Sequence, residues 1–395
     1  MTRPPSIAPD RLFTRAFAAV FAAALVFFVS GGIVIPIAPR FATGPLGADA
    51  LGFGIALGIF SLASLAVRPL VGWSADRFGR RPLLVGGSLL TVVALLLHLP
   101  AAGMPPFIAA RALLGVGEAC FLVAGLAAGG DLAPPRRTGE ALSLLSLSIY
   151  IGVAVGPVIG ESLLGAGGYP AVWVGAAMLA AVAAGLALLA PETRPSARRT
   201  DGAPRGRLFH PGGVFPGFLM LCGTFGMAGF LTFVPLHAAA LGLDGAGSAF
   251  AVFGTVVIVL RLFGAKIPDR LGPVRLGATA LGCTAFGLTL IGVLPGQAGL
   301  LLGTAVFAAG VALTLPAVMT MAMGRAAAEE RGSVVGTTSV FLDLSFGLAP
   351  VVLAPLAASA GYPSTFIAAG ALAAIGAVVL VARRAAAVPS VQPAG

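Results

Sequence analysis

Long apolar segments alternate with short polar connections along almost the whole chain. Twelve of these segments reach roughly 20 residues, the length that an α-helix needs to cross the hydrocarbon core of a membrane. The pattern therefore predicts an all-α membrane protein with twelve transmembrane helices. The expected helices cover residues 13–37, 50–71, 82–100, 104–128, 140–164, 169–190, 213–237, 246–264, 274–294, 297–323, 333–357 and 362–383.

One longer polar connection divides the predicted helices into two groups of six. Residues 191–212 contain five arginines and four prolines, a composition typical of an extended linker. We therefore expect an N-terminal six-helix bundle within residues 1–190, a linker over 191–212 and a C-terminal six-helix bundle within 213–395.

The composition supports a membrane location, and the charge distribution predicts the orientation. Of the 395 residues, 58% are hydrophobic and only 10% are charged, whereas soluble domains carry about 25% charged residues. The net charge of +10 comes from arginines that cluster in the connections on one side of the predicted helices, with Arg40 alone on the other side. By the positive-inside rule, both termini and the linker are cytoplasmic in a multi-pass protein of the inner (plasma) membrane. Because topology explains the basic charge, no nucleic-acid partner is expected.

An internal repeat supports the division into two halves. Several residues of the first half recur at one fixed offset of 193 positions in the second half. Two parallel repeats are a transporter architecture, in which the substrate site lies between the halves near the middle of the membrane. The recurring residues are Arg68, Asp76, Arg77 and Gly79, which correspond to Arg261, Asp269, Arg270 and Gly272, and Pro157, which corresponds to Pro350.

The connection between the second and third predicted helices carries a specific motif. Its glycine Gly72 would allow close helix packing, and its aspartate Asp76 could meet the positive N-terminus of another helix. The complete motif comprises Gly72, Asp76, Arg77, Gly79 and Arg80. It resembles the cytoplasmic signature of the major facilitator superfamily, and the twelve-helix plan and the repeat extend this resemblance over the whole chain.

The resemblance implies a cytoplasmic latch between the two halves. In the family, the aspartate and the second arginine of the motif form a charge relay with an acid at the end of the fourth helix, and the matching residues here are Asp76, Arg80 and Asp131. The second copy of the motif keeps Asp269 and Arg270 but has lost other positions. The latch is therefore expected to be asymmetric.

The fifth predicted helix resembles a second family signature, which is typical of the antiporters. Its small residues and proline predict a kinked helix that packs closely against a neighbour. The matching residues are Gly152, Gly156, Pro157 and Gly160, whereas Ser143 and Glu161 stand where the family pattern has glycine.

Four ionisable residues inside the predicted helices are candidates for proton coupling or substrate binding, because charges are costly at this depth. Arg111 and Glu118 are seven residues apart and share one face of the fourth helix. Glu161 is expected at the same depth as Arg111, so that the two could pair. Asp343 is the only acid inside a predicted helix of the second half. For each of them, a structural salt bridge or packing role is the alternative.

Together these features predict a secondary active transporter that exports a small organic solute in exchange for protons by alternating access. Proton-linked uptake and a non-transporting membrane sensor built on the same fold are the alternatives. A phosphate-binding Gly-x-x-x-x-Gly-Lys loop is absent, because the only lysine, Lys266, follows Ala265. No catalytic cluster, metal site or cofactor is expected, so the protein is predicted not to be an enzyme. One chain holds both repeats and could function as a monomer in the lipid bilayer.

Overall fold

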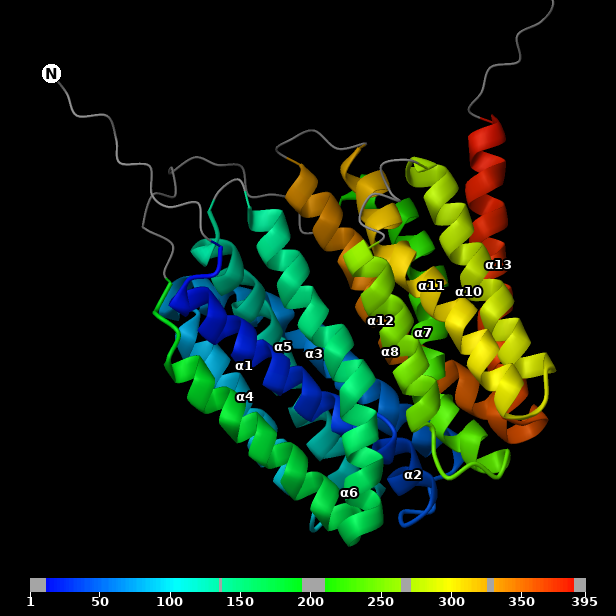
Figure 1. Ribbon diagram of the computed structural model, residues 1–395, viewed down its shortest axis with the longest axis horizontal. Helices are drawn as coiled ribbons and strands as arrows, with labels where there is room; N and C mark the ends of the chain where they lie inside the picture. The colour runs from blue at the N-terminus through cyan, green and yellow to red at the C-terminus, as the bar shows by residue number, and fades with distance from the viewer. Residues whose placement is uncertain (1–11, 135–136, 194–209, 264–270, 325–329, 387–395) are drawn as a thin grey trace, which may run out of the picture.

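The computed structural model is a bundle of long α-helices (Figure 1), and it contains no strand among the residues it describes. The structure describes residues 12–134, 137–193, 210–263, 271–324 and 330–386. The two halves of the chain lie beside one another, with the N-terminal half in blue to green and the C-terminal half in green to red (Figure 1).

The N-terminal half contains six helical elements, which supply the first six membrane spans. They are α1 (Arg15–Val34), α2 (Ile37–Thr43), α3 (Ala50–Phe78), α4 (Arg81–Leu96), α5 (Met104–Leu132) and α6 (Thr138–Leu188). The first predicted span is interrupted at Ile35 and Pro36, because proline cannot donate a backbone hydrogen bond. The fifth and sixth predicted spans form the single element α6, which bends where Gly167 and Gly168 leave the helical conformation.

The C-terminal half begins with a 3-10 turn at Pro211–Gly213 and repeats the plan. Its helices are α7 (Val214–Ala240), α8 (Gly247–Phe263), α10 (Pro273–Val293), α11 (Gly296–Met323), α12 (Arg331–Ala360) and α13 (Tyr362–Ala386). Nine helical stretches of the described residues are long and apolar enough to cross a membrane, and α4 and α8 are shorter apolar helices. Since α6 contains two spans, the described helices account for all twelve predicted ones.

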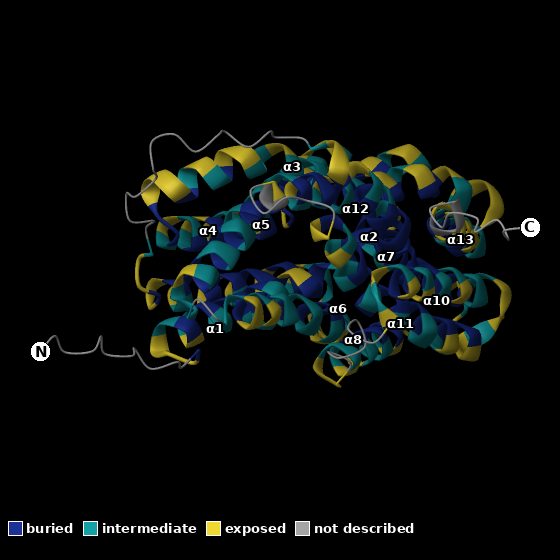
Figure 2. Cartoon of the chain, turned by 90° about the horizontal axis from the view of Figure 1, so that it is seen from above, coloured by how far each residue is buried: buried dark blue, intermediate teal, exposed yellow. Residues whose placement is uncertain are grey.

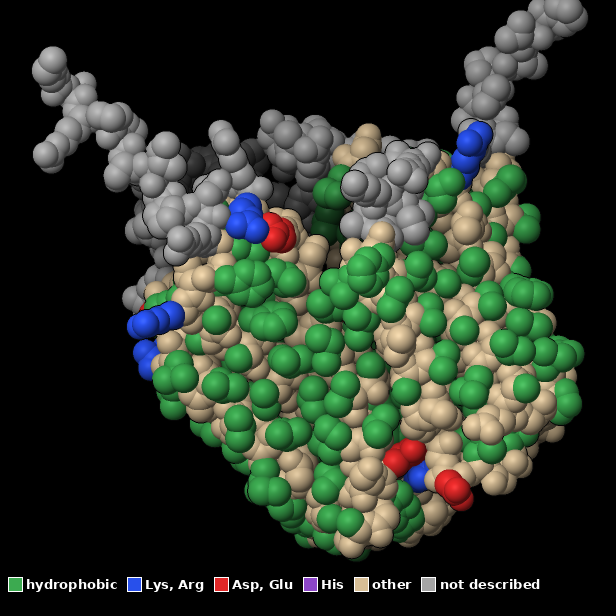
Figure 3. Space-filling view, viewed as in Figure 1, with side chains coloured by type: hydrophobic (Ala, Val, Ile, Leu, Met, Phe, Trp, Pro, Cys, Tyr) green, Lys and Arg blue, Asp and Glu red, His purple; other side chains and the backbone are tan. Residues whose placement is uncertain are grey.

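The outer surface has the apolar character expected of a membrane protein. Figure 3 shows hydrophobic side chains over the middle of the molecule and charged ones near its two ends. Large apolar side chains such as Leu70 and Val378 are 63% and 67% exposed. The buried residues face the interior of each bundle (Figure 2). Lipid rather than water is the solvent that such a surface requires.

Helices α1 and α6 pack with their backbones in direct contact. Gly152, Gly156 and Gly160 follow one another at four-residue spacing and therefore share one face of α6. A Cβ atom on Gly156 would lie 2.5 Å from the Cα atom of Gly32 on α1, and one on Gly152 would lie 2.3 Å from the carbonyl oxygen of Phe28. Only glycine fits at such distances, which explains the small residues of this motif.

The two halves meet most closely on the face opposite the linker. Helix α3 starts on that face, and near its start a Cβ atom on Gly54 would lie 2.8 Å from the Cα atom of Val351 on α12. One turn later, a Cβ atom on Gly58 would lie 2.3 Å from the carbonyl oxygen of Gly347. On the linker face, the space-filling surface is hollowed between the halves (Figure 3). The helices therefore converge on one face and leave a recess on the other.

Candidate functional site

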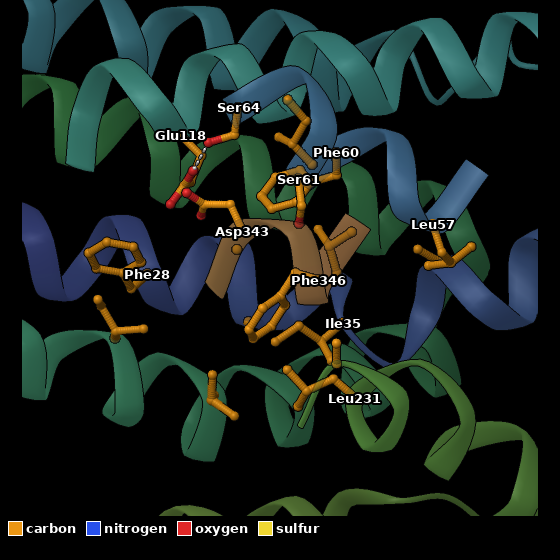
Figure 4. Close-up of a pocket in the computed structure, with 18 of the residues that line it drawn as sticks. Phe28, Ile35, Leu57, Phe60, Ser61, Ser64, Glu118, Leu231, Asp343 and Phe346 are labelled. Carbon is orange, nitrogen blue, oxygen red and sulfur yellow. Dashed lines mark hydrogen bonds between the residues drawn. The ribbon is translucent and has the colours of Figure 1, made fainter. Parts of the chain in front are cut away.

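A cavity of about 320 Å³ lies between the two halves, at the level where α3 and α12 cross. Its walls come from α1, α2, α3, α4, α5, α6, α7 and α12, so both halves contribute. Most of the lining is apolar, and Phe28, Ile35, Leu57, Leu231 and Phe346 are examples (Figure 4). The charged side chains that line it are Arg68, Arg111, Glu118 and Asp343. Such an apolar chamber with few polar groups is typical of a small-molecule site.

An ion pair joins the two halves inside the cavity. Arg68 of α3 donates a hydrogen bond from Nη1 to Oδ2 of Asp343 on α12, at 2.5 Å. The Asp343 side chain is only 7% exposed, and that of Arg68 is 26% exposed. Removing water from these charges strengthens their attraction but also makes either charge costly without the other. The pair therefore couples the position of α12 to that of α3.

A second carboxylate lies beside this pair. Glu118 of α5 accepts a hydrogen bond from the hydroxyl of Ser64 on α3, at 2.9 Å. The side chains of Glu118 and Asp343 approach each other in the cavity (Figure 4). The cavity thus concentrates two carboxylates and the guanidinium of Arg68 at the boundary between the halves.

Arg111 lines the same cavity but has different neighbours. Its Nε donates to the carbonyl oxygen of Ala56 at 3.4 Å, and its guanidinium lies over the ring of Phe60, 5.2 Å from the centroid. The expected pairing of Arg111 with Glu161 is wrong in this structure. The two side chains do not pair because each has other partners.

Glu161 instead lies outside the cavity lining and joins the halves at the face opposite the linker. Its carboxylate accepts hydrogen bonds from the backbone N–H groups of Ala246 and Gly247, at 2.6 and 2.9 Å. These groups form the positive N-terminus of α8 in the C-terminal half. Nη2 of Arg40 lies 3.8 Å from Oε1 of Glu161. The N-terminal half therefore caps a helix of the C-terminal half.

The structure brings the three residues of the expected charge relay together. Nη2 of Arg80 lies 3.4 Å from Oδ1 of Asp76, and Nε of Arg80 lies 3.1 Å from Oδ2 of Asp131. Its backbone N–H also donates to Glu192, just before the linker, at 2.7 Å. The preceding residue Gly79 has φ of 98°, a conformation that favours glycine. All of these residues belong to the N-terminal half or the start of the linker.

Other parts of the expected latch differ from the sequence prediction. The close packing expected at Gly72 is wrong in this structure, because an added Cβ atom would meet no atom within 4 Å. The guanidinium carbon of Arg77 lies over the ring of Trp73, 5.4 Å from its centroid. Both residues belong to α3, so this contact does not join two helices. The second copy of the motif, with Asp269 and Arg270, lies outside the described residues.

Sequence reasoning missed Arg68 as a site residue. The signal was available, since Arg68 is a cation inside the predicted span 50–71 and has a copy at Arg261. A charge at that depth requires a partner. Ser64 and Arg40 gave no comparable signal, because their roles depend on neighbours that only the folded chain brings close.

The comparisons with known proteins agree with this architecture. The sequence model of the Major Facilitator Superfamily matches residues 20–350, and a second match covers 269–395. The chain therefore belongs to the major facilitator superfamily. The family implies transport across a membrane, and we conclude that the protein is a multi-pass membrane transporter.

Similar proteins are known at the level of sequence and of fold. An uncharacterised transporter of this superfamily from Salmonella typhimurium is 29% identical over 373 residues, which cover 91% of this chain and 94% of that protein. Another from Burkholderia mallei is 28% identical over 366 residues, covering 89% and 88%. Among solved structures, the human organic anion transporter MFSD10 has a TM-score of 0.69 at 20% identity, covering 94% of this chain and 100% of that chain. The nucleoside transporter NupG has a TM-score of 0.75 at 12% identity, covering 93% and 99%. These structural similarities show the fold alone.

Proposed function

We propose that the protein is a secondary active transporter that exchanges protons for a small organic solute by alternating access, and that it functions as a monomer in the inner membrane. The observation that carries the proposal is the Arg68–Asp343 pair, which crosses from one half to the other inside the cavity. Ionisable residues at this depth are costly and mark ion or substrate pathways. A titratable link between the moving parts is what proton coupling requires.

Protonation of Asp343 provides the coupling step. A charged Asp343 holds Arg68 and thereby ties α12 to α3. When Asp343 takes up a proton, its negative charge disappears and Arg68 loses its partner across the boundary. Glu118 lies in the same cavity and is the carboxylate available to neutralise Arg68 within the N-terminal half. Proton uptake therefore releases one half from the other and changes the balance between the two access states.

The charge distribution and the helix contacts support an orientation for this cycle. With the arginine-rich linker face toward the cytoplasm, the closed face around Gly54 and Glu161 is periplasmic and the hollowed face is cytoplasmic (Figure 3). The structure then represents an inward-facing state. The cluster of Asp76, Arg80 and Asp131 would join the halves only in the outward-facing state, which explains why its contacts lie within the N-terminal half here.

Proton flux in proteoliposomes tests the proposal. The purified protein is reconstituted, and a pH-sensitive dye reports proton movement when sugars, antibiotics, amino acids or organic anions are added. Solute-dependent proton movement in the direction opposite to the solute is expected for the native protein. The direction also separates export by exchange from proton-linked uptake, in which both move the same way.

Asp343→Asn tests the assigned proton site in the same assay. The variant should still bind solute, because the amide keeps the shape of the side chain, but it should lose accumulation driven by a pH gradient. Ser339→Ala is a matched control on the same helix, since the one partner of the Ser339 hydroxyl among the described residues is the carbonyl of Val335 in its own helix. Normal gradient-driven transport by Asp343→Asn would refute the assignment.

A further inference from the structure

Arg111 is a buried cation that has no carboxylate partner among the described residues. The residue is 8% exposed, and among the described residues it forms no ion pair. Its single hydrogen bond within that part of the chain is the one from Nε to Ala56. A guanidinium carries five N–H donors, so the four donors on its two terminal nitrogens remain available.

The other charged groups of the cavity are already engaged. Asp343 is paired with Arg68, and Glu118 accepts a hydrogen bond from Ser64. With both carboxylates ionised, the two arginines bring the cavity to neutrality as a whole, but the charge is unevenly placed. Arg111 lies against the ring of Phe60 and apolar walls.

We propose that the transported solute is a small organic monoanion, a monocarboxylate with an apolar body, and that Arg111 binds its carboxylate. This inference rests on the proposed function, in that it takes the cavity to be the transport site. A carboxylate matches the planar guanidinium with two parallel hydrogen bonds and would give Arg111 the anionic partner that the described residues do not supply. The apolar remainder of the solute lies against the apolar walls of the same cavity, which include Phe60, Leu114 and Ile35.

The size of the cavity fits such a solute. Its volume of about 320 Å³ is at the low end of the range for small-molecule pockets, roughly 300–1,000 Å³. The same charge argument disfavours cationic solutes, because an ammonium group beside Arg111 would meet a like charge in a mostly apolar cavity. A neutral amide would leave the buried guanidinium unpaired. The site should therefore discriminate by the charge of the head group more than by the body.

Matched ligands test the proposal directly. Hexanoate, benzoate and 4-phenylbutanoate are compared with their primary amides and with the corresponding primary amines, using the purified full-length protein in detergent. Binding is measured by isothermal titration calorimetry and by the shift of the thermal unfolding midpoint. At least one acid should bind at least tenfold more tightly than its amide and amine. If none of the acids binds, or if an amide or amine binds as tightly as its acid, the proposal is overturned.

Variants then assign the selectivity to Arg111. Arg111→Gln should weaken acid binding at least tenfold and abolish the preference for acid over amide, whereas Arg111→Lys should keep part of it. Arg275→Gln, which removes an exposed arginine at the start of α10, is the matched control and should bind acids normally. If a folded Arg111→Gln variant binds acids with native affinity, the assignment to Arg111 is overturned. If that variant does not fold, the ligand series measured on the native protein still decides the solute class.

The same preparations separate this inference from the proposed function. If acids bind through Arg111 but no proton moves during their transport, the solute class stands and proton coupling fails. If amines or neutral solutes drive proton exchange and Arg111→Gln transports normally, proton coupling stands and the solute class fails.

Discussion

Gly156 determines how closely α1 and α6 approach each other. An added Cβ atom there would lie 2.5 Å from the carbonyl carbon of Gly32, a backbone atom that cannot move without displacing α1. We expect Gly156→Ala to lower the free energy of unfolding by about 1–3 kcal/mol, because overpacking at a helix contact forces the backbones apart. The thermal unfolding midpoint of the purified protein measures this loss.

Gly165 provides the matched control on the same helix. An added Cβ atom at that position meets nothing within 4 Å. Gly165→Ala should therefore leave the midpoint unchanged or raise it, because the higher helix propensity of alanine can add up to about 1 kcal/mol to the free energy of unfolding. Equal effects of the two substitutions would show that backbone contact is not what the glycines of this motif provide.

The charged residues of the cavity were predictable individually, but their partners were not. The cost of burying a charge singled out Arg111, Glu118 and Asp343 from sequence. The partner of Asp343, however, is Arg68, which lies 275 residues earlier and in the other half. A hydropathy pattern places a residue at a depth along its own helix, and it contains no information on which helix of the other half lies opposite.

Most helices were predictable for a simple physical reason, and the exceptions have local causes. In lipid, each span must be a continuous apolar helix, so hydropathy alone locates α3, α5 and α11. Pro36 breaks the first span into α1 and α2. The connection at Gly167 and Gly168 looks like an ordinary loop in the sequence but is a sharp bend inside α6, with φ of 65° at Gly168.

The contact between α6 and α8 acts as a clasp on the face opposite the linker. Glu161 caps the N-terminus of α8 through two backbone N–H groups, and this contact must break for the halves to separate there. Glu161→Gln removes the charge that the helix dipole stabilises, a loss of about 1–2 kcal/mol in a partly buried geometry. We therefore expect the state that is open on this face to become about five- to thirtyfold more populated.

Spin labels on the same face of the molecule, on α3 and α12, measure how far the halves separate there. Leu51 at the start of α3 and Ser359 at the end of α12 are exposed and lie on the same face in different halves. With cysteines at these two positions and the three native cysteines replaced, double electron–electron resonance should show longer distances in Glu161→Gln. Ser162→Ala is the neighbouring control, since in the part of the chain that the structure describes the Ser162 hydroxyl bonds only to the Val158 carbonyl within α6. Identical distance distributions in Glu161→Gln and the native background would contradict the clasp.

Within the described residues, two arginine side chains bond across the boundary between the halves, and the internal repeat relates one contact to the other. Arg68 of α3 meets Asp343 of α12, and Arg261 of α8 meets the hydroxyl of Tyr150 on α6 at 2.8 Å. Both members of the second link are related to the first by the offset of 193 positions, since Arg68 corresponds to Arg261 and Tyr150 to Asp343. The two contacts are therefore pseudo-symmetric, but in one the arginine binds a carboxylate and in the other it binds a phenol.

This asymmetry predicts that only one of the two links carries the proton. Tyr150→Phe removes the hydroxyl but keeps the ring, over which the Arg261 guanidinium lies 4.3 Å from the centroid. The lost hydrogen bond contributes about 1 kcal/mol, so the transport rate should change severalfold while the number of protons exchanged per solute stays the same. Asp343→Asn should instead remove the proton flux. Simultaneous recording of solute and proton flux in proteoliposomes gives the ratio directly, and a changed ratio in Tyr150→Phe would mean that both halves take part in proton coupling.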